Sequence, residues 1–420
     1  MAPPKIAIIG AGIAGPAAAI GLARNGHDVT IYERLPDINV TGYAFGLTPN
    51  SDRCLKYLGV DAQAGGAPVF ERGIAMDTSG KILWERRGRE ENKYGAVTGT
   101  TAFVYRPTLH RQLIKAALEL NVKIRSNQRV TNCDTESSVI TLESGERVFA
   151  DLIIGADGIH SYLRQWINDN NDNPLKPSSG HSAIRFMIPR SAVQGDASLL
   201  SLVEEANMFT WRGNGSEDGK QIIVYPVDFE EQINVVCTYD RHLTAEETSN
   251  ADDATAVAYN QKASLQTVKD IFRNFEPRAQ RLIELADSET FRMWELLDMD
   301  DIPRWTNNHA VMIGDACHPV LPFGFSGASM GIEDAITLSV LFPADTPKGN
   351  EIAARLELYE KIRRPRVARV RDYSREVARG VEDLQRAKDY RYFLMSHDAV
   401  KFAEDALRDF NLEEATKKIA

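Results

Sequence analysis

The residues best suited to chemistry begin with a glycine pattern near the amino terminus. Gly10, Gly12 and Gly15 form a G-x-G-x-x-G sequence, and Glu33 follows 18 residues after the last of them. In such a pattern the first glycine permits a tight turn, the second lets a pyrophosphate approach the backbone, and the third lets a helix pack closely on a strand. The acid can accept hydrogen bonds from an adenosine ribose and disfavours a 2′-phosphate. The spacing therefore predicts a site for FAD or NAD rather than NADP.

Residues 5–33 also supply the elements that must position this site. The apolar run KIAII precedes the glycines, an alanine-rich stretch follows them, and a second apolar run ends at Glu33. We expect a strand, a helix and a second strand, so that the unpaired N–H groups and the positive end of the helix dipole face the phosphates. Pro16 fits the first helical turn, where its missing N–H has no partner in any case.

A second candidate turn lies at the end of the apolar run DLIIG. Its sequence is Gly155-Ala156-Asp157-Gly158, and a helix is expected to follow. Ligands collect at the carboxyl ends of strands in α/β sheets, so the turn suits a binding site. The alternative is a simple turn in which Asp157 caps the helix.

A third glycine-rich junction comes late in the chain, at residues 314–335 (GDACHPVLPFGFSGASMGIEDA). Asp315 at a strand end could hold a chain of hydroxyl groups. The helix expected after Gly327 could direct its N-terminus at a carbonyl that develops negative charge. A nicotinamide dehydrogenase has no need of such a late element, whereas the isoalloxazine ring of a flavin extends beyond the ADP half. The junction therefore favours FAD over NAD.

The composition narrows the class of partner. The chain has 420 residues, a formal net charge of −10 and 43% hydrophobic residues, which is ordinary for a globular protein of two packed domains. The negative charge opposes binding to nucleic acid or to an anionic membrane surface, so a small molecule is the expected partner. No run is apolar enough for a membrane span, and the four cysteines are scattered without a C-x-x-C pair. We expect a cytoplasmic protein with no metal site.

Taken together, the motifs resemble the FAD-dependent aromatic hydroxylases with the para-hydroxybenzoate hydroxylase fold, the class A flavoprotein monooxygenases. The resemblance is greatest to the branch of salicylate hydroxylase and 6-hydroxynicotinate monooxygenase and covers nearly the whole chain. Beside the three junctions it rests on GLTPNSDRCLKYLGV (46–60), YRPTLHRQL (105–113), RFMIP (185–189) and VYPV (224–227). It implies a monooxygenase that uses NAD(P)H and O2 to hydroxylate a small or medium aromatic (a phenol, aromatic acid or hydroxypyridine) through a flavin C4a-hydroperoxide.

The resemblance also implies roles for individual residues. Glu33 would bind the ribose of FAD, Arg106 the region of pyrophosphate and flavin, Asp315 the ribityl chain, and Ala328 the pyrimidine end of the flavin. No second G-x-G-x-x-G occurs, which agrees with a family whose NAD(P)H binds transiently. The full set of expected FAD contacts is Gly10, Gly12, Ile13, Ala14, Gly15, Glu33, Arg34, Ala44, Gly46, Arg106, Asp157, Gly314, Asp315, Gly327, Ala328 and Ser329.

Three residues are the candidates for catalysis. Arg185 and Tyr225 resemble positions that bind a phenolate or carboxylate in related hydroxylases, and an arginine can stabilise an oxyanion. The carbonyl of Pro322 would lie close to the flavin and the reacting carbon. Arg185 could instead pair with a structural acid, and Pro322 could be a turn proline. His318 could shuttle a proton, but a structural hydrogen bond is the better interpretation.

Other residues leave substrate size open. Trp211, Phe323 and Phe325 are expected to be pocket or core aromatics. Two segments depart from the family pattern: Gly42-Tyr43-Ala44-Phe45, where relatives commonly have Gly-Ala-Gly-Ile, and Phe325-Ser326-Gly327, where they often have Ala-Gln-Gly. The first change adds a bulky aromatic near the expected flavin ring.

The predicted fold is α/β, with a Rossmann-like FAD-binding domain that is discontinuous in sequence (1–70, 100–175 and 285–345). A mostly antiparallel substrate-binding sheet (71–99 and 176–284) would roof the flavin, and helices would fill 346–420. The basic segment 361–379 could form a groove, but a helix kinked at Pro365 with a solvated or internally paired face is favoured in so acidic a chain.

Two alternatives to aromatic hydroxylation stay open at this level. An epoxidase or oxidative dearomatase could use the same fold and cofactor. A non-catalytic FAD-binding protein is also compatible with the unusual Tyr43-Ala44-Phe45 segment. We expect either a monomer or a homodimer.

Overall fold

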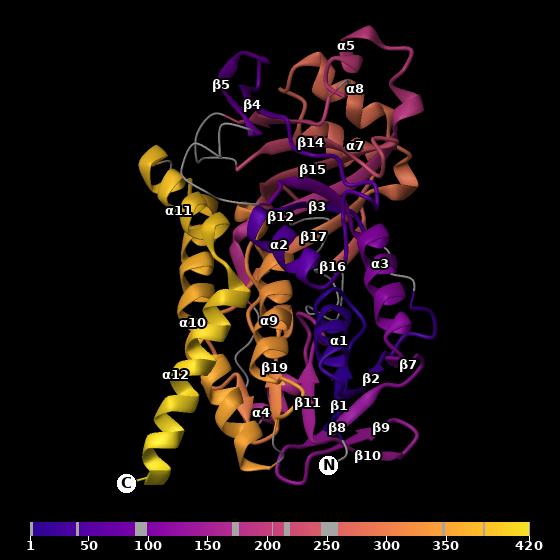
Figure 1. Cartoon of the computed structure of the whole chain (residues 1–420). Helices are drawn as coiled ribbons and strands as arrows, with labels where there is room; N and C mark the ends of the chain where they lie inside the picture. Colours follow the sequence, from indigo (N-terminus) through magenta and orange to yellow (C-terminus); the bar gives the residue numbers. More distant parts are fainter. Residues whose placement is uncertain are drawn as a thin grey trace.

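The computed structural model describes residues 3–38, 42–88, 99–169, 176–203, 205–213, 219–244, 259–346, 349–380 and 383–419. Two large sheets dominate it, one around β1 (Lys5–Ile9) and β11 (Leu152–Gly155) and the other around β12 (Lys176–Pro189) and β15 (Gln232–Asp240) (Figure 1). The long helices α10 (Asn350–Ala378) and α12 (Ala399–Ile419) run along one side of the molecule.

The first sheet is built around the amino-terminal strand. Its neighbouring strands are parallel except for the β18–β19 pair. The central strands are buried along nearly their whole length, as expected of a parallel sheet covered on both faces, which explains their continuous apolar runs. The strand order is β18 (Thr306–Asn307), β19 (Ala310–Met312), β11 (Leu152–Gly155), β1 (Lys5–Ile9), β2 (Asp28–Tyr32) and β7 (Lys123–Arg125).

The late junction returns to this sheet as the sequence predicts. β19 pairs in parallel with β11, and the chain then passes through a short 3-10 turn at Gly314–Ala316 into α9 (Gly327–Leu341). α9 lies against α1 (Ala14–Arg24) (Figure 1). The two helices approach closely, because a Cβ built at Gly21 would lie 2.6 Å from the Ser339 Cβ. The late junction and the amino-terminal glycine pattern therefore lie side by side in the fold.

The second sheet is larger and mostly antiparallel. Its only parallel pairing is between β13 and β4 among the described strands. On one face, side chains of β12 such as Ile184 and Phe186 pack against α7 and α8, so that Arg185 between them faces the other way. The strand order is β16 (Tyr259–Lys262), β17 (Arg292–Asp298), β12 (Lys176–Pro189), β15 (Gln232–Asp240), β14 (Gln221–Val227), β13 (Asn207–Arg212), β4 (Arg72–Asp77) and β5 (Ile82–Arg87).

Two smaller sheets accompany the large ones. A two-stranded sheet consists of β3 (Ala44–Leu47) and β6 (Ala102–Tyr105), and a three-stranded sheet of β8 (Val130–Asp134), β9 (Val139–Leu142) and β10 (Arg147–Phe149). The helices outside the carboxyl-terminal region, besides α1 and α9, are α2 (Pro49–Tyr57), α3 (Arg106–Glu119), α4 (Leu163–Ile167), α5 (Ala197–Leu200), α7 (Leu265–Ile271) and α8 (Pro277–Leu285).

The pairing of the strands bears on the predicted domain boundaries. β17 pairs with β12 in the larger sheet, although a boundary at residue 285 would assign it to the FAD-binding part. The expected three-part division, with boundaries at 70, 100, 175, 285 and 345, otherwise stays a proposal. The α/β fold class itself is confirmed by the two sheets and the carboxyl-terminal helices.

Three helices form the carboxyl-terminal region: α10 (Asn350–Ala378), α11 (Leu384–Ser396) and α12 (Ala399–Ile419). α10 continues as one helix through Pro365. Its arginines form ion pairs within the protein, including Arg363 with Glu333 and Arg375 with Asp298. The internally paired interpretation of segment 361–379 is therefore confirmed.

Candidate active site

One large cavity, of about 2850 Å³, is lined by residues from both large sheets and from the carboxyl-terminal helices. It brings together most of the residues predicted from the sequence. Those that line it are Gly10, Gly12, Glu33, Arg34, Ala44, Gly46, Arg106, Asp157, Arg185, Tyr225, Pro322, Asp315, Gly327 and Ala328. The other five expected cofactor contacts lie next to these positions in the chain but outside the lining: Ile13, Ala14, Gly15, Gly314 and Ser329.

The glycine loop has the shape of a phosphate cradle. Gly10 has φ +105°, and a Cβ there would lie 2.4 Å from the Ala156 carbonyl oxygen. A Cβ at Gly15 would lie 2.1 Å from the Gly10 carbonyl oxygen. Both positions therefore require glycine for the packing of the protein itself. A Cβ at Gly12 would meet no atom of the described protein within 4 Å, so the space beside it suits a ligand that approaches the backbone.

Two side chains hold this loop in place. The Glu33 carboxylate accepts hydrogen bonds from the N–H of Ala11 at 2.8 Å and from the N–H of Leu35 at 2.9 Å. His110 Nε2 donates to the Ala11 carbonyl oxygen at 2.6 Å. Burial lowers the pKa of His110, so the ring is neutral at physiological pH. Hydrogen bonds within the protein therefore hold the loop.

Asp157 fits both interpretations of its turn, a helix cap and a binding site. Its Oδ2 accepts hydrogen bonds from the N–H groups of Tyr162 at 2.8 Å and Leu163 at 3.3 Å, so the carboxylate caps the chain that leads into α4. Its Oδ1 is buried and has no hydrogen-bond partner among the described residues. Burial raises the pKa of this carboxyl. A polar atom left this way at the cavity wall fits a ligand hydroxyl.

Asp315 stands at the end of β19 on a turn that Arg164 holds. Arg164 donates from Nε to the Ala316 carbonyl oxygen at 2.9 Å and from Nη2 to the Asp315 carbonyl oxygen at 3.1 Å. Asp315 is exposed, and it lines the cavity. Desolvation by the surrounding protein raises the pKa of its carboxyl group, while the charges of His318, Arg106 and Arg164 lower it.

The late loop turns sharply before α9. Pro322–Gly324 form a 3-10 turn, and Phe325 follows in the left-handed region with φ 53°. Phe325 packs on Gly46, where a Cβ would lie 2.9 Å from its ring. A Cβ at Gly327 would make only an ordinary contact, 3.7 Å from Val320 Cγ2, so the protein leaves room at the start of α9. The Ser329 hydroxyl forms a hydrogen bond within the protein, with its Oγ 2.9 Å from Ser51 Oγ.

The two candidates from the larger sheet face the cavity. Arg185 donates a hydrogen bond from Nη2 to the Ala44 carbonyl oxygen, and its guanidinium lies 5.2 Å from the centre of the Tyr43 ring. Tyr225 stacks on Phe103 with ring centres 4.4 Å apart. Burial raises the pKa of Tyr225 to about 12, and Arg185 opposes this effect. Tyr225 is therefore a protonated donor at neutral pH beside a fixed cation.

The unusual Tyr43 is anchored to the larger sheet. Its hydroxyl donates to the Thr290 carbonyl oxygen at 2.9 Å, and its ring meets Trp294 edge to face at 5.1 Å. The aromatic that replaces a smaller family residue thus joins the two-stranded sheet to β17 and forms part of the cavity wall.

The other aromatic candidates divide between core and cavity. Phe323 and Phe325 line the cavity. Trp211 is fully buried on the opposite face of the larger sheet, where its Nε1 donates to Glu276. His318 makes the structural hydrogen bond expected of it, with Nε2 2.6 Å from Asp334 Oδ2.

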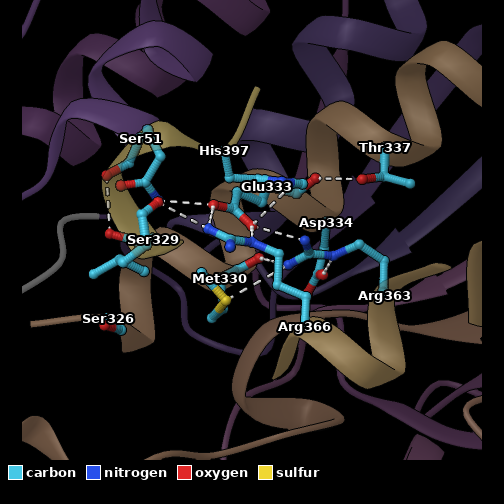
Figure 2. Close-up of polar contacts among 12 residues, drawn as sticks. Ser51, Ser326, Ser329, Met330, Glu333, Asp334, Thr337, Arg363, Arg366 and His397 are labelled. Atoms are coloured by element: carbon cyan, nitrogen blue, oxygen red, sulfur yellow. Dashed lines mark hydrogen bonds and ion pairs between the residues drawn. The ribbon is translucent and has the colours of Figure 1, made fainter. Parts of the chain in front are cut away.

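A buried ion cluster behind the late loop escaped the sequence analysis (Figure 2). Glu333 pairs with Arg363 at 2.7 Å and with Arg366 at 2.6 Å, and all three side chains are buried. Asp334 pairs with Arg363 at 2.7 Å and accepts the Gly314 N–H at 2.9 Å. The two acidic residues of the motif IEDA were visible in the sequence. Their partner arginines could not be predicted, because they lie 29 to 33 residues further along the chain.

The cluster ties α9 to α10 behind the cavity. Burial of Glu333 opposes ionisation, yet the two arginines hold its pKa well below the usual value. The carboxylate therefore stays charged and keeps α9 in place, with its N-terminus at the cavity. The carboxyl-terminal helices contribute to the cavity wall as well, which the sequence analysis did not predict.

Comparison with known proteins identifies the class. The chain belongs to the FAD-binding domain family, whose model matches residues 4–374. It is 29% identical to hispidin-3-hydroxylase of Neonothopanus nambi over 431 aligned residues, which cover 97% of this chain and 98% of the relative. It is also 29% identical to 6-hydroxynicotinate 3-monooxygenase of Bordetella bronchiseptica over 379 residues, which cover 89% and 91%.

The solved structures agree in fold. The complex of CtdE with FAD and its substrate 4 superposes with a TM-score of 0.80 at 20% identity and covers 97% of this chain and 98% of that one. The resemblance to FAD-dependent aromatic hydroxylases is thereby confirmed, and the protein is an FAD-dependent monooxygenase. The cradle at Gly12 and the unpartnered oxygen of Asp157 fit the FAD that the family requires.

The described residues form neither a membrane span nor a metal-binding cluster. No described helix combines the length and apolar character needed to cross a bilayer. Nor do the described His, Cys, Asp and Glu side chains form a group of three or more that could hold a metal ion.

Proposed function

We propose that the enzyme hydroxylates a small or medium aromatic compound of the phenol, aromatic acid or hydroxypyridine type, with NAD(P)H as electron donor and O2 as oxygen source. One observation carries the proposal: Gly12 and Asp315, expected at the cofactor, line the same cavity as Arg185 and Tyr225, expected at the substrate. A relative named for 6-hydroxynicotinate, an aromatic acid with a ring hydroxyl, supports this substrate class.

The cofactor side of the cavity is assigned by the groups that it offers. Glu33 would accept from the ribose, Arg106 would face the pyrophosphate, Asp315 would accept from the ribityl hydroxyls, and Ala328 would lie at the pyrimidine end of the flavin. Bound FAD supplies the electron transfer and the activation of oxygen. The chain supplies position, fixed charge and a wall that excludes water.

The substrate side offers a cation and a neutral donor. The Arg185 guanidinium can stabilise a phenolate or carboxylate, because a charge-assisted hydrogen bond is about twice as strong as a neutral one. Tyr225 keeps its proton at neutral pH and can donate to the same oxygen. A substrate held as its phenolate is more electron-rich on the ring, which favours attack on an electrophilic oxygen. The Pro322 carbonyl lies in the cavity wall and would orient the ring.

The test compares variants on the proposed substrate side. We expect the purified protein to be yellow and to oxidise NADH or NADPH faster when a phenol or aromatic acid is added. Arg185→Lys should lower product formation at least tenfold, because a point ammonium cannot copy a planar fork. Arg190→Lys, in the residue that directly follows the same strand and pairs with Glu230, is the matched control. Unchanged rate and substrate affinity in both Arg185→Lys and Tyr225→Phe would place the substrate elsewhere.

Three finer points stay predictions from the sequence. They are the transient binding of NAD(P)H, a cytoplasmic location, and a monomeric or homodimeric state.

A further inference from the structure

A tyrosine of the carboxyl-terminal region reaches the loop that closes the cavity. Tyr390 belongs to α11, and its hydroxyl lies 2.9 Å from Ser326 Oγ, 64 residues away in the chain. Both side chains are buried, at 4% and 1% exposure. Ser326 directly precedes α9, so the contact joins α11 to the start of that helix.

The direction of the hydrogen bond follows from the proton count. Ser326 Oγ donates its single proton to the Gly324 carbonyl oxygen at 2.7 Å. It must therefore accept from Tyr390, whose phenol keeps its proton because burial raises its pKa to about 12. A chain of two hydrogen bonds thus runs from α11 to the last carbonyl of the Pro322–Gly324 turn.

The turn needs such support. Phe325 follows it at φ 53°, a conformation that non-glycine residues adopt only where their surroundings enforce it. The backbone hydrogen bond that closes the turn, from the Phe325 N–H to the Pro322 carbonyl oxygen, is long at 3.2 Å. Tyr390 also lies against Gly324, where a Cβ would be 3.1 Å from its hydroxyl.

Tyr390 itself is held rigidly. Its ring stacks on Tyr373 of α10, with centres 3.6 Å apart and planes within 9°. One turn further along α11, Arg366 donates to the Leu394 carbonyl oxygen at 3.1 Å while it pairs with Glu333. Figure 2 shows Ser326 and this cluster together on and around α9. The loop, α9, α10 and α11 therefore form one closed set of contacts.

We propose that Tyr390 is a positioning residue of the active site, which holds the Pro322–Gly324 turn through Ser326 so that electrons from the cofactor lead to hydroxylation rather than to hydrogen peroxide. The inference rests on the proposed function for its catalytic part. In the coupled reaction NAD(P)H, O2, a proton and the substrate give NAD(P)+, water and the hydroxylated product. In the uncoupled reaction the same NAD(P)H, O2 and proton give NAD(P)+ and hydrogen peroxide, and the substrate is unchanged.

The experiment uses four forms of the FAD-loaded enzyme: wild type, Tyr390→Phe, Ser326→Ala and the double variant. Tyr392→Phe is the matched control, because it removes the same hydroxyl from an exposed tyrosine of α11. The first measurement is hydrogen exchange of the amides at 323–330. We expect it to be at least fivefold faster in both single variants, no faster still in the double variant, and unchanged in the control.

The second measurement is the ratio of product formed to NAD(P)H consumed. We expect Tyr390→Phe and Ser326→Ala each to lower it at least threefold and to raise peroxide, with FAD content and substrate KM retained. Faster exchange with an unchanged ratio would reduce the contact to a structural one and overturn the proposal. Unchanged exchange would overturn it as well. A wild type that oxidises no NAD(P)H with any aromatic would instead contradict the proposed function, and the exchange measurement would still decide whether Tyr390 holds the turn.

Discussion

At the scale of single residues, the glycine loop separates what the protein requires from what its ligand requires. Gly10 and Gly15 cannot be replaced without a clash, because a Cβ at these positions would lie 2.4 and 2.1 Å from neighbouring carbonyl oxygens. Gly12 has no such contact with the described protein. Three glycines that look alike in the sequence thus have different physical reasons, and only one of them reports directly on the cofactor.

This difference gives a prediction for Gly12→Ala. The added methyl group meets no described protein atom, so the free energy of unfolding of the FAD-free protein should change by less than about 0.5 kcal/mol. FAD affinity should fall at least tenfold, because the methyl group occupies the space of the pyrophosphate. Calorimetric titration with FAD measures the loss. Gly195→Ala, which also meets nothing within 4 Å but lies outside the cavity lining, should leave affinity unchanged. An unaltered affinity in Gly12→Ala would remove the phosphate assignment.

At the scale of elements, the site depends on how closely α1 and α9 approach. α1 carries the glycine loop at its N-terminus, and α9 carries the late loop at its own. Gly21 and Ser339 mark a close approach between them, because a Cβ built on the glycine would lie 2.6 Å from the Ser339 Cβ. Small residues on the two helices therefore let the two binding loops approach each other.

We predict that Gly21→Ala lowers stability even though alanine is the better helix former. The intrinsic gain of up to about 1 kcal/mol is outweighed by overpacking of about 1–3 kcal/mol against Ser339. Urea unfolding should show the loss, and the double variant Gly21→Ala with Ser339→Gly should recover part of it. If the single variant is more stable than wild type, the helices are not held at contact distance.

At the scale of the whole molecule, the buried ion cluster joins parts far apart in the chain and makes stability depend on pH. His397 lies 3.9 Å from Glu333 Oε2. Burial lowers the pKa of His397 from 6.5 to about 4; Arg366 and Arg363 act in the same direction, while Glu333 and Asp398 oppose it. Since the folded-state pKa is below the unfolded one, the unfolded state takes up the proton first as pH falls.

Stability from His397 is therefore complete above pH 6.5 and is lost between pH 6.5 and about 4, with a slope of about 1.4 kcal/mol per pH unit. His27 and His110, whose pKa values burial also lowers, contribute to the same slope. We predict that His397→Gln makes the slope shallower by that amount. Urea unfolding of both proteins at pH 7, 6 and 5 measures it, and parallel curves would show that His397 titrates normally in the folded state.

The sequence predicted the parts of this molecule that are local and missed those that depend on distant side chains. The glycine loop, the Asp157 turn and the return of β19 follow from short motifs whose neighbours are fixed by strand and helix geometry. The anchoring of Tyr43 to Thr290 joins residues 247 positions apart, and no short pattern specifies it. The same is true of Glu333 with its arginines and of Tyr390 with Ser326, because the packing of α10 and α11 decides both. The substrate-side assignment of Arg185 and Tyr225 came from resemblance, and their common cavity now supports it.

The most direct test of the account is the fate of molecular oxygen. The FAD-loaded enzyme would be given NADH or NADPH, a panel of phenols, aromatic acids and hydroxypyridines, and 18O2 in ordinary water, with products analysed by mass spectrometry. We expect a hydroxylated product that carries one 18O atom, in an amount that falls at least tenfold in Arg185→Lys. Consumption of NAD(P)H that yields only hydrogen peroxide across the panel, or a product whose new oxygen comes from water, would contradict it.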